Sequence, residues 1–315
     1  MIPEIVPNVH VAPKSADLPK FADVPAPIAI TFVVTAAAAA GFLIRAKEEN
    51  EDIILYYSEV LLSPRFNEQN RIVPSYNMEL FESHFSNLRG NLFYDAATNN
   101  YEMFSGKGTS HHINYLTFKK LFEQMGTPRE PIILESGIAS RGTQSTYLFN
   151  EVVRKYGGNF WSVDNDPELV SNHQGNMCPG TKLVHNDSVA FFKEWTSTSS
   201  STSTYTSGIP KADIIYLDSY DLDFYNPEPS GKHGLAEYMA LRHAIKKDTL
   251  LLIDDTPINP YWLDTRGALY NNMLDYYGIF GIMPGKGMYV LDEVKNAEKL
   301  IHNYQVLYRF SESPY

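Results

Sequence analysis

The stretch Pro131-Ile-Ile-Leu-Glu-Ser-Gly-Ile-Ala-Ser-Arg-Gly-Thr-Gln-Ser-Thr146 decides the fold of this chain. Its apolar run at 132–134 predicts a short buried strand, and the glycines at 137 and 142 predict a tight turn into a helix. Strand, turn and helix together make the opening unit of a parallel α/β sheet. By itself the glycine turn is a weak signal, because it lacks the Gly-x-Gly-x-x-Gly fingerprint of dinucleotide-binding domains.

Beyond residue 146 the chain alternates regularly between short apolar runs and segments of helical periodicity. Such alternation forms βαβ units and a parallel sheet. We therefore predict an α/β fold: a Rossmann-like, doubly wound, mostly parallel seven-stranded sheet with helices on both faces, plus an N-terminal extension. The predicted strands are residues 132–134, 159–163, 182–185, 212–217, 249–253, 287–291 and 304–310, and the predicted helices are residues 146–156, 188–195 and 234–245.

Outside the predicted sheet, the sequence predicts a hairpin, a helix and a surface loop. A polar turn predicts a hairpin over 91–104, and apolar residues at helical spacing predict a helix over 113–125. The Ser/Thr-rich stretch 196–207 predicts a surface loop. The predicted domains are a proline-rich tail and apolar segment at 1–50, an N-terminal cap or lid at 51–126, and the Rossmann-like domain at 127–315.

Residues 26–44 carry no charge and end at Arg45. A membrane-spanning helix needs about 20 apolar residues, so the length fits, but alanine and threonine contribute little to insertion. Two interpretations stay open: a membrane anchor, or a buried helix or strand–helix pair packed on the domain. The single cysteine, Cys178, allows no intramolecular disulfide, which fits a reducing compartment. We expect a cytoplasmic protein, with membrane association through 26–44 as the alternative.

The net charge of the chain indicates which partners to expect. The formal net charge is −11 and the isoelectric point is about 5.3, and the chain has no run of lysines and arginines. Because phosphate binding depends on clustered cations, we expect no nucleic acid partner. The sequence does not indicate an oligomeric state.

Polar residues follow successive predicted strands. Ligands of open parallel sheets bind at the carboxyl ends of the strands, near the point where the strand order reverses. Asp164 follows the second strand, where a carboxylate can accept hydrogen bonds from ribose hydroxyls. Asp187 and Ser188 follow the third strand, where polar groups can meet an adenine edge. Each could also be a simple helix cap, but their succession favours a nucleotide-like ligand.

The pattern Glu-x-Gly-x-x-x-x-Gly-x-x-Ser-Thr at 135–146, with an Asp after the second and fourth strands, resembles the class I S-adenosylmethionine-dependent methyltransferases. Within that superfamily it is most similar to the metal-dependent small-molecule O-methyltransferases of sugar and catechol type, over roughly 107–310. The resemblance implies S-adenosylmethionine as cofactor. The implied contacts are Glu135 and Gly137 with the methionine part, Ser140 and Gly142 in the same loop, Asp164 with the ribose, and Asp187 and Ser188 with the adenine.

The resemblance leaves two details of this implied cofactor site open. The family's loop often has a further glycine where this chain has Ala139, so the loop's details are open. The glycine-rich segment 105–112 carries Lys107, which could fold over the carboxylate of the cofactor. The same segment could instead be a flexible entry to the helix at 113–125.

Three aspartates follow the fourth and fifth predicted strands: Asp218, and the pair Asp254 and Asp255. Neighbouring strands bring their ends together, and carboxylates that meet without a cation repel each other. A divalent ion removes that cost, and oxygen ligands suit Mg²⁺. The metal-dependent O-methyltransferases carry acids at these places, so the resemblance implies a Mg²⁺ site at Asp218, Asp254 and Asp255.

A hydroxyl is a poor nucleophile until it loses its proton. A metal that binds the hydroxyl lowers its pKa, and a nearby base then takes the proton. We name Asp218, Asp221 and His233 as candidate catalytic residues, with Asp223 as a further base. A solvated acidic loop and a histidine at a helix start are the alternative interpretations.

These features predict a Mg²⁺-assisted, S-adenosylmethionine-dependent O-methyltransferase that acts on a small hydroxylated acceptor such as a sugar or glycoside. One alternative is a non-catalytic Rossmann-like scaffold tethered through its N-terminal segment. Another is a nicotinamide-dependent oxidoreductase, which the missing dinucleotide fingerprint and the Asp254-Asp255 pair both disfavour.

Overall fold

A computed structural model describes residues 33–35, 42–48, 51–57, 76–126, 128–197, 210–265 and 267–314. The chain divides into two compact units, Met1–Arg71 and Ile72–Tyr315. In the first unit three strands pair antiparallel in the order β1-β2-β3. Their bounds are β1 Val33–Thr35, β2 Phe42–Glu48 and β3 Glu51–Tyr57.

The predicted apolar segment 26–44 falls partly on described residues. Residues 33–35 and 42–44 lie in strands β1 and β2, so they do not take the helical form that an anchor or a buried helix would require there. The rest of this segment, including the alanine run at 36–40, lies outside the described residues. Among the residues that the structure describes, no helix has the length and apolar character needed to cross a bilayer.

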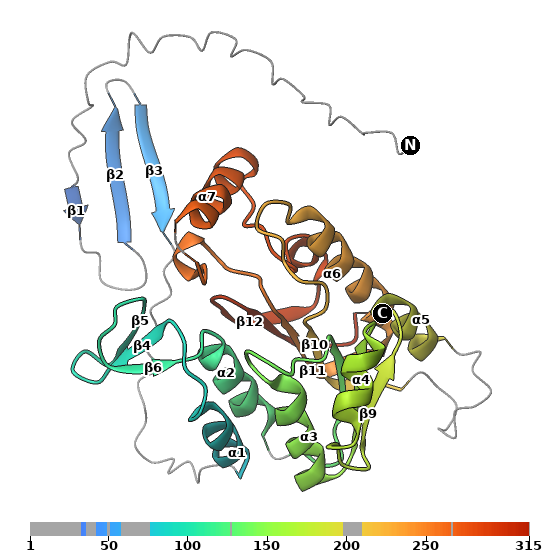
Figure 1. The fold of residues 1–315 in the computed structure, drawn as a ribbon. Helices are drawn as coiled ribbons and strands as arrows, with labels where there is room; N and C mark the ends of the chain where they lie inside the picture. The colour runs from blue at the N-terminus through green and yellow to red at the C-terminus, as the bar shows by residue number, and fades with distance from the viewer. Residues whose placement is uncertain are drawn as a thin grey trace, which may run out of the picture. The chain divides into compact units, whose positions relative to one another are not determined.

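The second unit contains the seven-stranded sheet (Figure 1), in the order β12-β13-β11-β10-β7-β8-β9. Strand β13 runs antiparallel to both of its neighbours, and the other strands run parallel to one another. The predicted, mostly parallel, doubly wound sheet is therefore confirmed. The strand bounds are β7 Ile132–Ser136, β8 Asn159–Asp164, β9 Thr181–His185, β10 Ala212–Leu217, β11 Ile245–Ile253, β12 Ala297–His302 and β13 Val306–Phe310.

Helices cover both faces of the sheet, as Figure 1 shows. Side chains of a strand alternate between its faces, and successive residues of the strands belong to two separate clusters. Ile133 and Ile214 pack with the first group of helices, whereas Leu134 and Ile215 pack with the second. The first group is α1 Tyr76–Phe85, α2 Tyr115–Met125 and α3 Ser145–Tyr156, and the second is α5 Ser188–Thr196, α6 Glu228–Leu241 and α8 Val290–Glu293.

The predicted cap region, 51–126, is divided between the two units: β3 lies in the first unit, and residues 76–126 lie in the second. Phe81 of α1 and Phe118 of α2 are buried in the same cluster as Tyr216 of the sheet, and the boundary between units lies after Arg71. The predicted boundary near residue 126 therefore does not separate two compact units. The predicted hairpin is confirmed, and its strands join a third in the order β5-β4-β6. Their bounds are β4 Leu92–Asp95, β5 Asn100–Met103 and β6 Thr109–His111.

One predicted strand is wrong. Residues 287–289 form a turn and residues 290–291 begin α8, because the carbonyl of Gly287 accepts hydrogen bonds from the amides of Val290 and Leu291. The sixth strand of the sheet is β12 instead. Sequence patterning also missed three further helices of the described residues. Helix α1 buries Phe81 and Phe85, whereas α4, Pro167–Gln174, buries none of its residues and α7, Ala268–Phe280, buries only Met273. The structure also contains short 3-10 turns at Arg242–Ala244 and Pro260–Trp262.

Candidate functional site

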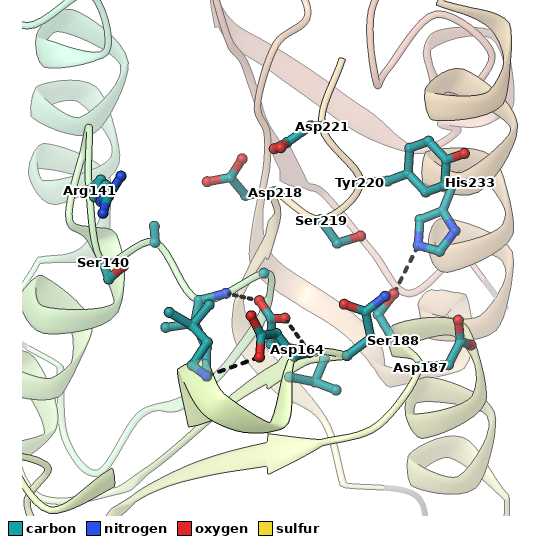
Figure 2. A pocket seen from close by; sticks show the side chains of 17 residues that line it. Ser140, Arg141, Asp164, Asp187, Ser188, Asp218, Ser219, Tyr220, Asp221 and His233 are labelled. Atoms are coloured by element: carbon teal, nitrogen blue, oxygen red, sulfur yellow. Dashed lines mark hydrogen bonds between the residues drawn. The ribbon is translucent and has the colours of Figure 1, made fainter. Parts of the chain in front are cut away.

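A pocket of about 640 Å³ opens at the carboxyl ends of strands β7, β8, β9 and β10 (Figure 2). This is where the chain order reverses, since β7 pairs with β8 on one side and with β10 on the other. Open parallel sheets bind ligands at such switch points. The residues that line the pocket are Gly137, Ile138, Ala139, Ser140, Arg141, Val163, Asp164, Asn165, Asp166, Leu169, Asp187, Ser188, Asp218, Ser219, Tyr220, Asp221 and His233.

The turn after β7 forms one wall of the pocket and requires glycine at 137. Gly137 has φ +84°, and its amide donates to the Val163 carbonyl at 2.8 Å. A Cβ at this position would lie 2.6 Å from the carbonyl oxygen of Asp218. Gly142 also has positive φ but does not line the pocket. The backbones at the ends of β7 and β10 therefore approach as closely as they do only because residue 137 has no side chain.

Asp164 lies in the floor of the pocket (Figure 2) and holds two turns together. Its Oδ2 accepts the amide of Ile138 at 2.9 Å, and its Oδ1 accepts the amide of Asp166 at 2.9 Å. A carboxylate offers about four lone-pair positions. After these two backbone bonds, acceptor positions remain that can take hydroxyl groups of a ligand. The neighbouring Asp166 caps helix α4 by accepting the amides of Glu168 and Leu169.

The groups at the end of β9 form a connected chain on another side of the pocket. Asp187 caps α5 by accepting the amide of Ala190 at 2.8 Å. The hydroxyl of Ser188 lies 3.0 Å from Nε2 of His233, which also lies 3.4 Å from the buried carboxylate of Glu237. The hydrogen bond that His233 donates to Glu237 raises the pKa of His233 above its usual value. His233 thus lies between Ser188 and Glu237, and its contacts with both side chains suit a positioning role.

Besides Gly142, two of the predicted cofactor residues do not line the pocket, namely Glu135 and Lys107. Glu135 is fully buried beneath the turn, where its carboxyl accepts the hydroxyls of Ser145, Thr146 and Ser162, each at 2.6 Å. Burial raises its pKa to about 7 despite these three donors. Lys107 is exposed in the turn between β5 and β6. Of the described residues that line the pocket, the one lysine or arginine is Arg141, which sequence reasoning did not select.

The three predicted metal ligands do converge. Asp218 lies in the pocket wall, and its carboxyl is hydrogen-bonded to that of Asp254. Burial and the charge of Asp218 raise the pKa of Asp254 to about 7. Asp255 is the third member, and the Tyr304 hydroxyl donates to its Oδ1 at 2.5 Å. Asp254 and Asp255 lie behind the wall and do not line the pocket.

A lysine already lies among these aspartates. The Nζ of Lys286 is 2.7 Å from Oδ1 of Asp218 and 3.2 Å from Oδ2 of Asp255. Lys286 is 4% exposed, and although burial opposes its charge, the three carboxylates raise its pKa well above the usual value. Sequence reasoning missed Lys286, which is 68 residues from Asp218 in the chain.

The residues as placed do not fit a divalent ion. Two unit charges 4 Å apart repel by about 4 kcal/mol at an effective dielectric of about 20, so the repulsion between the ammonium and a divalent ion beside it is about 8 kcal/mol. Within the described residues, no group of three or more histidine, cysteine, aspartate or glutamate side chains has the arrangement of a metal site. An ion at this place would have to displace Lys286 from Asp218 and Asp255.

Buried amides complete the surroundings of Asp254. Its Oδ1 accepts Nε2 of Gln305 at 2.6 Å and Nδ2 of Asn114 at 3.4 Å. His112 lies nearby with its pKa lowered by burial, although the charge of Asp254 opposes that shift. These residues come from connecting segments far apart in the sequence, and no short motif marks them.

No family model and no curated protein matches the sequence. Solved structures with a similar fold include the MycE methyltransferase of the mycinamycin biosynthetic pathway, in complex with Mg and SAH (11% identity, 64% of this chain and 50% of that one, TM-score 0.43). A TehB-like SAM-dependent methyltransferase from Corynebacterium glutamicum shares 19% identity over 42% of this chain and 59% of its own (TM-score 0.27). Human N-acetylserotonin methyltransferase, in complex with SAM, shares 12% identity over 63% and 53% (TM-score 0.35).

This chain thus aligns with between half and three fifths of each of these proteins. At these identities and TM-scores the likeness describes the fold alone. Any conclusion about chemistry has to rest on the pocket itself.

Proposed function

We propose that this chain is an S-adenosylmethionine-dependent methyltransferase that methylates a hydroxyl group of a small acceptor. The observation that carries the proposal is the order of groups around one pocket. The Gly137 turn, Asp164, and Asp187 with Ser188 follow three successive strands at the switch point of the sheet. A volume of about 640 Å³ suits a ligand of nucleoside size with an acceptor beside it.

In this proposal each part of the cofactor contacts a different side of the pocket. Asp164 accepts the ribose hydroxyls with the lone pairs that its two backbone bonds leave open. Asp187 and Ser188 face the adenine, and the turn from Gly137 to Ser140 faces the methionine part. Arg141, rather than the exposed Lys107, binds the carboxylate of the cofactor, because a guanidinium pairs well with a carboxylate. Glu135 supports this turn from below and does not touch the ligand.

The bound cofactor supplies a methyl group on a positively charged sulfur: the carbon–sulfur bond breaks as a carbon–oxygen bond forms, leaving a neutral thioether. The chain has to hold the acceptor hydroxyl in line and remove its proton. Asp221 is exposed at the pocket, and Figure 2 shows it near Asp218, across the pocket from Asp164. We assign the proton transfer to Asp221, because Asp218 is paired with Lys286 and His233 is held by Ser188 and Glu237.

The acceptor belongs to the class of small hydroxylated molecules, and a sugar or glycoside remains our first candidate. The carboxylates at Asp218 and Asp221 offer acceptors for the several hydroxyl groups of such a ligand. The alternative is a non-catalytic protein that retains the pocket as a scaffold. Turnover separates the two, because a scaffold would bind the cofactor without transferring its methyl group.

The test is an assay of the full-length chain with methyl-labelled S-adenosylmethionine and a panel of sugars, glycosides and catechols. We expect label to appear in at least one hydroxylated acceptor, and the Asp221→Asn variant to transfer it at least about a hundredfold more slowly, as for loss of a general base. Asp223→Asn is the matched control, since Asp223 is an exposed acid of the same loop that does not line the pocket. Equal rates for wild type and Asp221→Asn would remove Asp221 from the mechanism, and cofactor binding without any turnover would favour the scaffold.

A further inference from the structure

Lys286 fills the place that the sequence assigns to a divalent ion. Its Nζ has three acceptors: Oδ1 of Asp218 at 2.7 Å, the Asp218 carbonyl at 3.1 Å and Oδ2 of Asp255 at 3.2 Å. An ammonium group has three protons to donate. Each proton therefore has a partner, and the charge lies between two of the three converging carboxylates.

The backbone around Lys286 holds it in this position. The Lys286 amide donates to the Asp255 carbonyl at 3.0 Å, and the Gly287 amide donates to the Thr256 hydroxyl at 2.9 Å. A Cβ on Gly285 would lie 2.2 Å from the Asp255 carbonyl oxygen, and one on Gly287 would lie 2.6 Å from Cγ2 of Thr256. The sequence Gly285-Lys-Gly287 thus lets the chain pass directly against the end of β11.

Helix α6 closes the other side of this segment. A Cβ on Gly234 would lie 2.4 Å from the Lys286 carbonyl oxygen, so the helix also needs a glycine where it meets the lysine backbone. Glycines at 234, 285 and 287 therefore all serve the same close packing. The backbone of Lys286 is therefore packed on two sides, which is not expected of a surface lysine that forms an ion pair by chance.

We propose that Lys286 is the resident cation of this site: it fixes Asp218 in the pocket wall, where a divalent ion would otherwise hold it, so that the pocket functions without a metal. Lys286 does not line the pocket and acts through Asp218, so it is a positioning residue. The proposal rests on the proposed function only in taking this pocket as the cofactor site. The ion preference of the aspartates can be measured whether or not the protein transfers methyl groups.

The test uses Mn²⁺ as the probe ion and the full-length chain, with bound Mn²⁺ measured by electron paramagnetic resonance. We expect no stoichiometric binding to wild type. Lys286→Met should raise Mn²⁺ affinity by more than about tenfold, because it removes the adjacent positive charge. The added substitution Asp255→Asn should abolish that gain. Lys286→Arg keeps a positive charge and should, like wild type, bind no stoichiometric Mn²⁺. If the lysine only filled space, keeping its charge would not be required for this result.

Two results would overturn the proposal. One is stoichiometric Mn²⁺ binding by wild type that Asp255→Asn removes. The other is a folded Lys286→Met variant, judged by circular dichroism, with no gain in Mn²⁺ affinity. Should that variant not fold, the wild-type titration still decides.

A second arm measures S-adenosylhomocysteine binding to wild type by calorimetry, with and without a chelator. Equal affinity supports the proposal, and affinity that falls with chelator and returns with Mg²⁺ contradicts it. Absence of any binding heat would instead count against the proposed cofactor, while the Mn²⁺ titration would still test Lys286.

Discussion

Replacing Glu135 with glutamine should remove a pH dependence from the stability of the sheet unit. The Glu135 carboxyl is fully buried, and burial raises its pKa from an ordinary 4.5 to about 7, against the effect of three hydroxyl donors. The folded chain therefore keeps a proton that the unfolded chain releases between pH 4.5 and about pH 7. Glutamine has nearly the same shape but does not ionise.

The sign and size of the effect follow from linkage. Where the folded state binds more protons than the unfolded state, the free energy of unfolding falls as the pH rises. Below pH 4.5 both states carry the proton on Glu135 and its full contribution is present; above about pH 7 both states have lost it. Since one pKa unit corresponds to about 1.4 kcal/mol, the contribution of Glu135 falls by about 3 kcal/mol across this window.

Urea denaturation of wild type and Glu135→Gln at a series of pH values measures this directly. The wild-type free energy of unfolding, minus that of the variant, should fall by about 3 kcal/mol as the pH rises from about 4.5 to about 8. Other titrating groups are common to both proteins and cancel in the difference. Glu151→Gln is the matched control, because Glu151 is half-exposed and pairs with Arg154, and its difference should stay flat. A flat or rising difference for Glu135→Gln would refute the reasoning.

Three further outcomes follow from the pocket geometry. Asp164→Asn should weaken S-adenosylhomocysteine binding by about 1.5–3 kcal/mol, roughly tenfold to 150-fold, because it removes a charged acceptor. Glu168→Gln is the control, since Glu168 is exposed and does not line the pocket, and it should leave the affinity measured by calorimetry unchanged. Gly137→Ala should lower the free energy of unfolding by at least about 2 kcal/mol, because residue 137 has positive φ and a Cβ there would overlap the backbone of residue 218. Gly142→Ala should cost less in urea denaturation, because Gly142 also has positive φ but a Cβ there would approach nothing more closely than Nε2 of His112, at 4.0 Å. His233→Leu should weaken cofactor binding without slowing methyl transfer from bound cofactor. The KM for S-adenosylmethionine should therefore rise, while kcat stays within about twofold of the wild-type value.

The sheet could be predicted because its signals are local. Apolar runs such as 212–217 are bounded by turns, and their alternation with helices indicates parallel strands. The helices α4 and α7 were missed for the same reason, since they bury almost no side chains and so show little apolar periodicity. Residues 287–291 resembled a strand because they are apolar, but packing around Gly287 turns the chain into α8 there.

The candidate site was predictable only where it follows strands directly. Gly137, Asp164 and Asp218 come straight after their strands and meet in one pocket. Glu135 is part of β7, and its side chain points into the interior toward Ser162 rather than to the ligand. Lys286 could not be found this way, because its position depends on how the segment after α7 packs against β11. A lysine that neutralises acids across such a distance leaves no local pattern.

The central claim is that S-adenosylmethionine occupies the pocket at the ends of β7, β8 and β9. Hydrogen–deuterium exchange of the full-length chain, with and without S-adenosylhomocysteine, tests it most directly. We expect slower exchange in the segments 137–141, 164–169 and 187–188, which contribute to the pocket lining, and unchanged exchange in the hairpin 92–103. No slowing in the three segments at saturating ligand, or slowing confined to other parts of the chain, would contradict it.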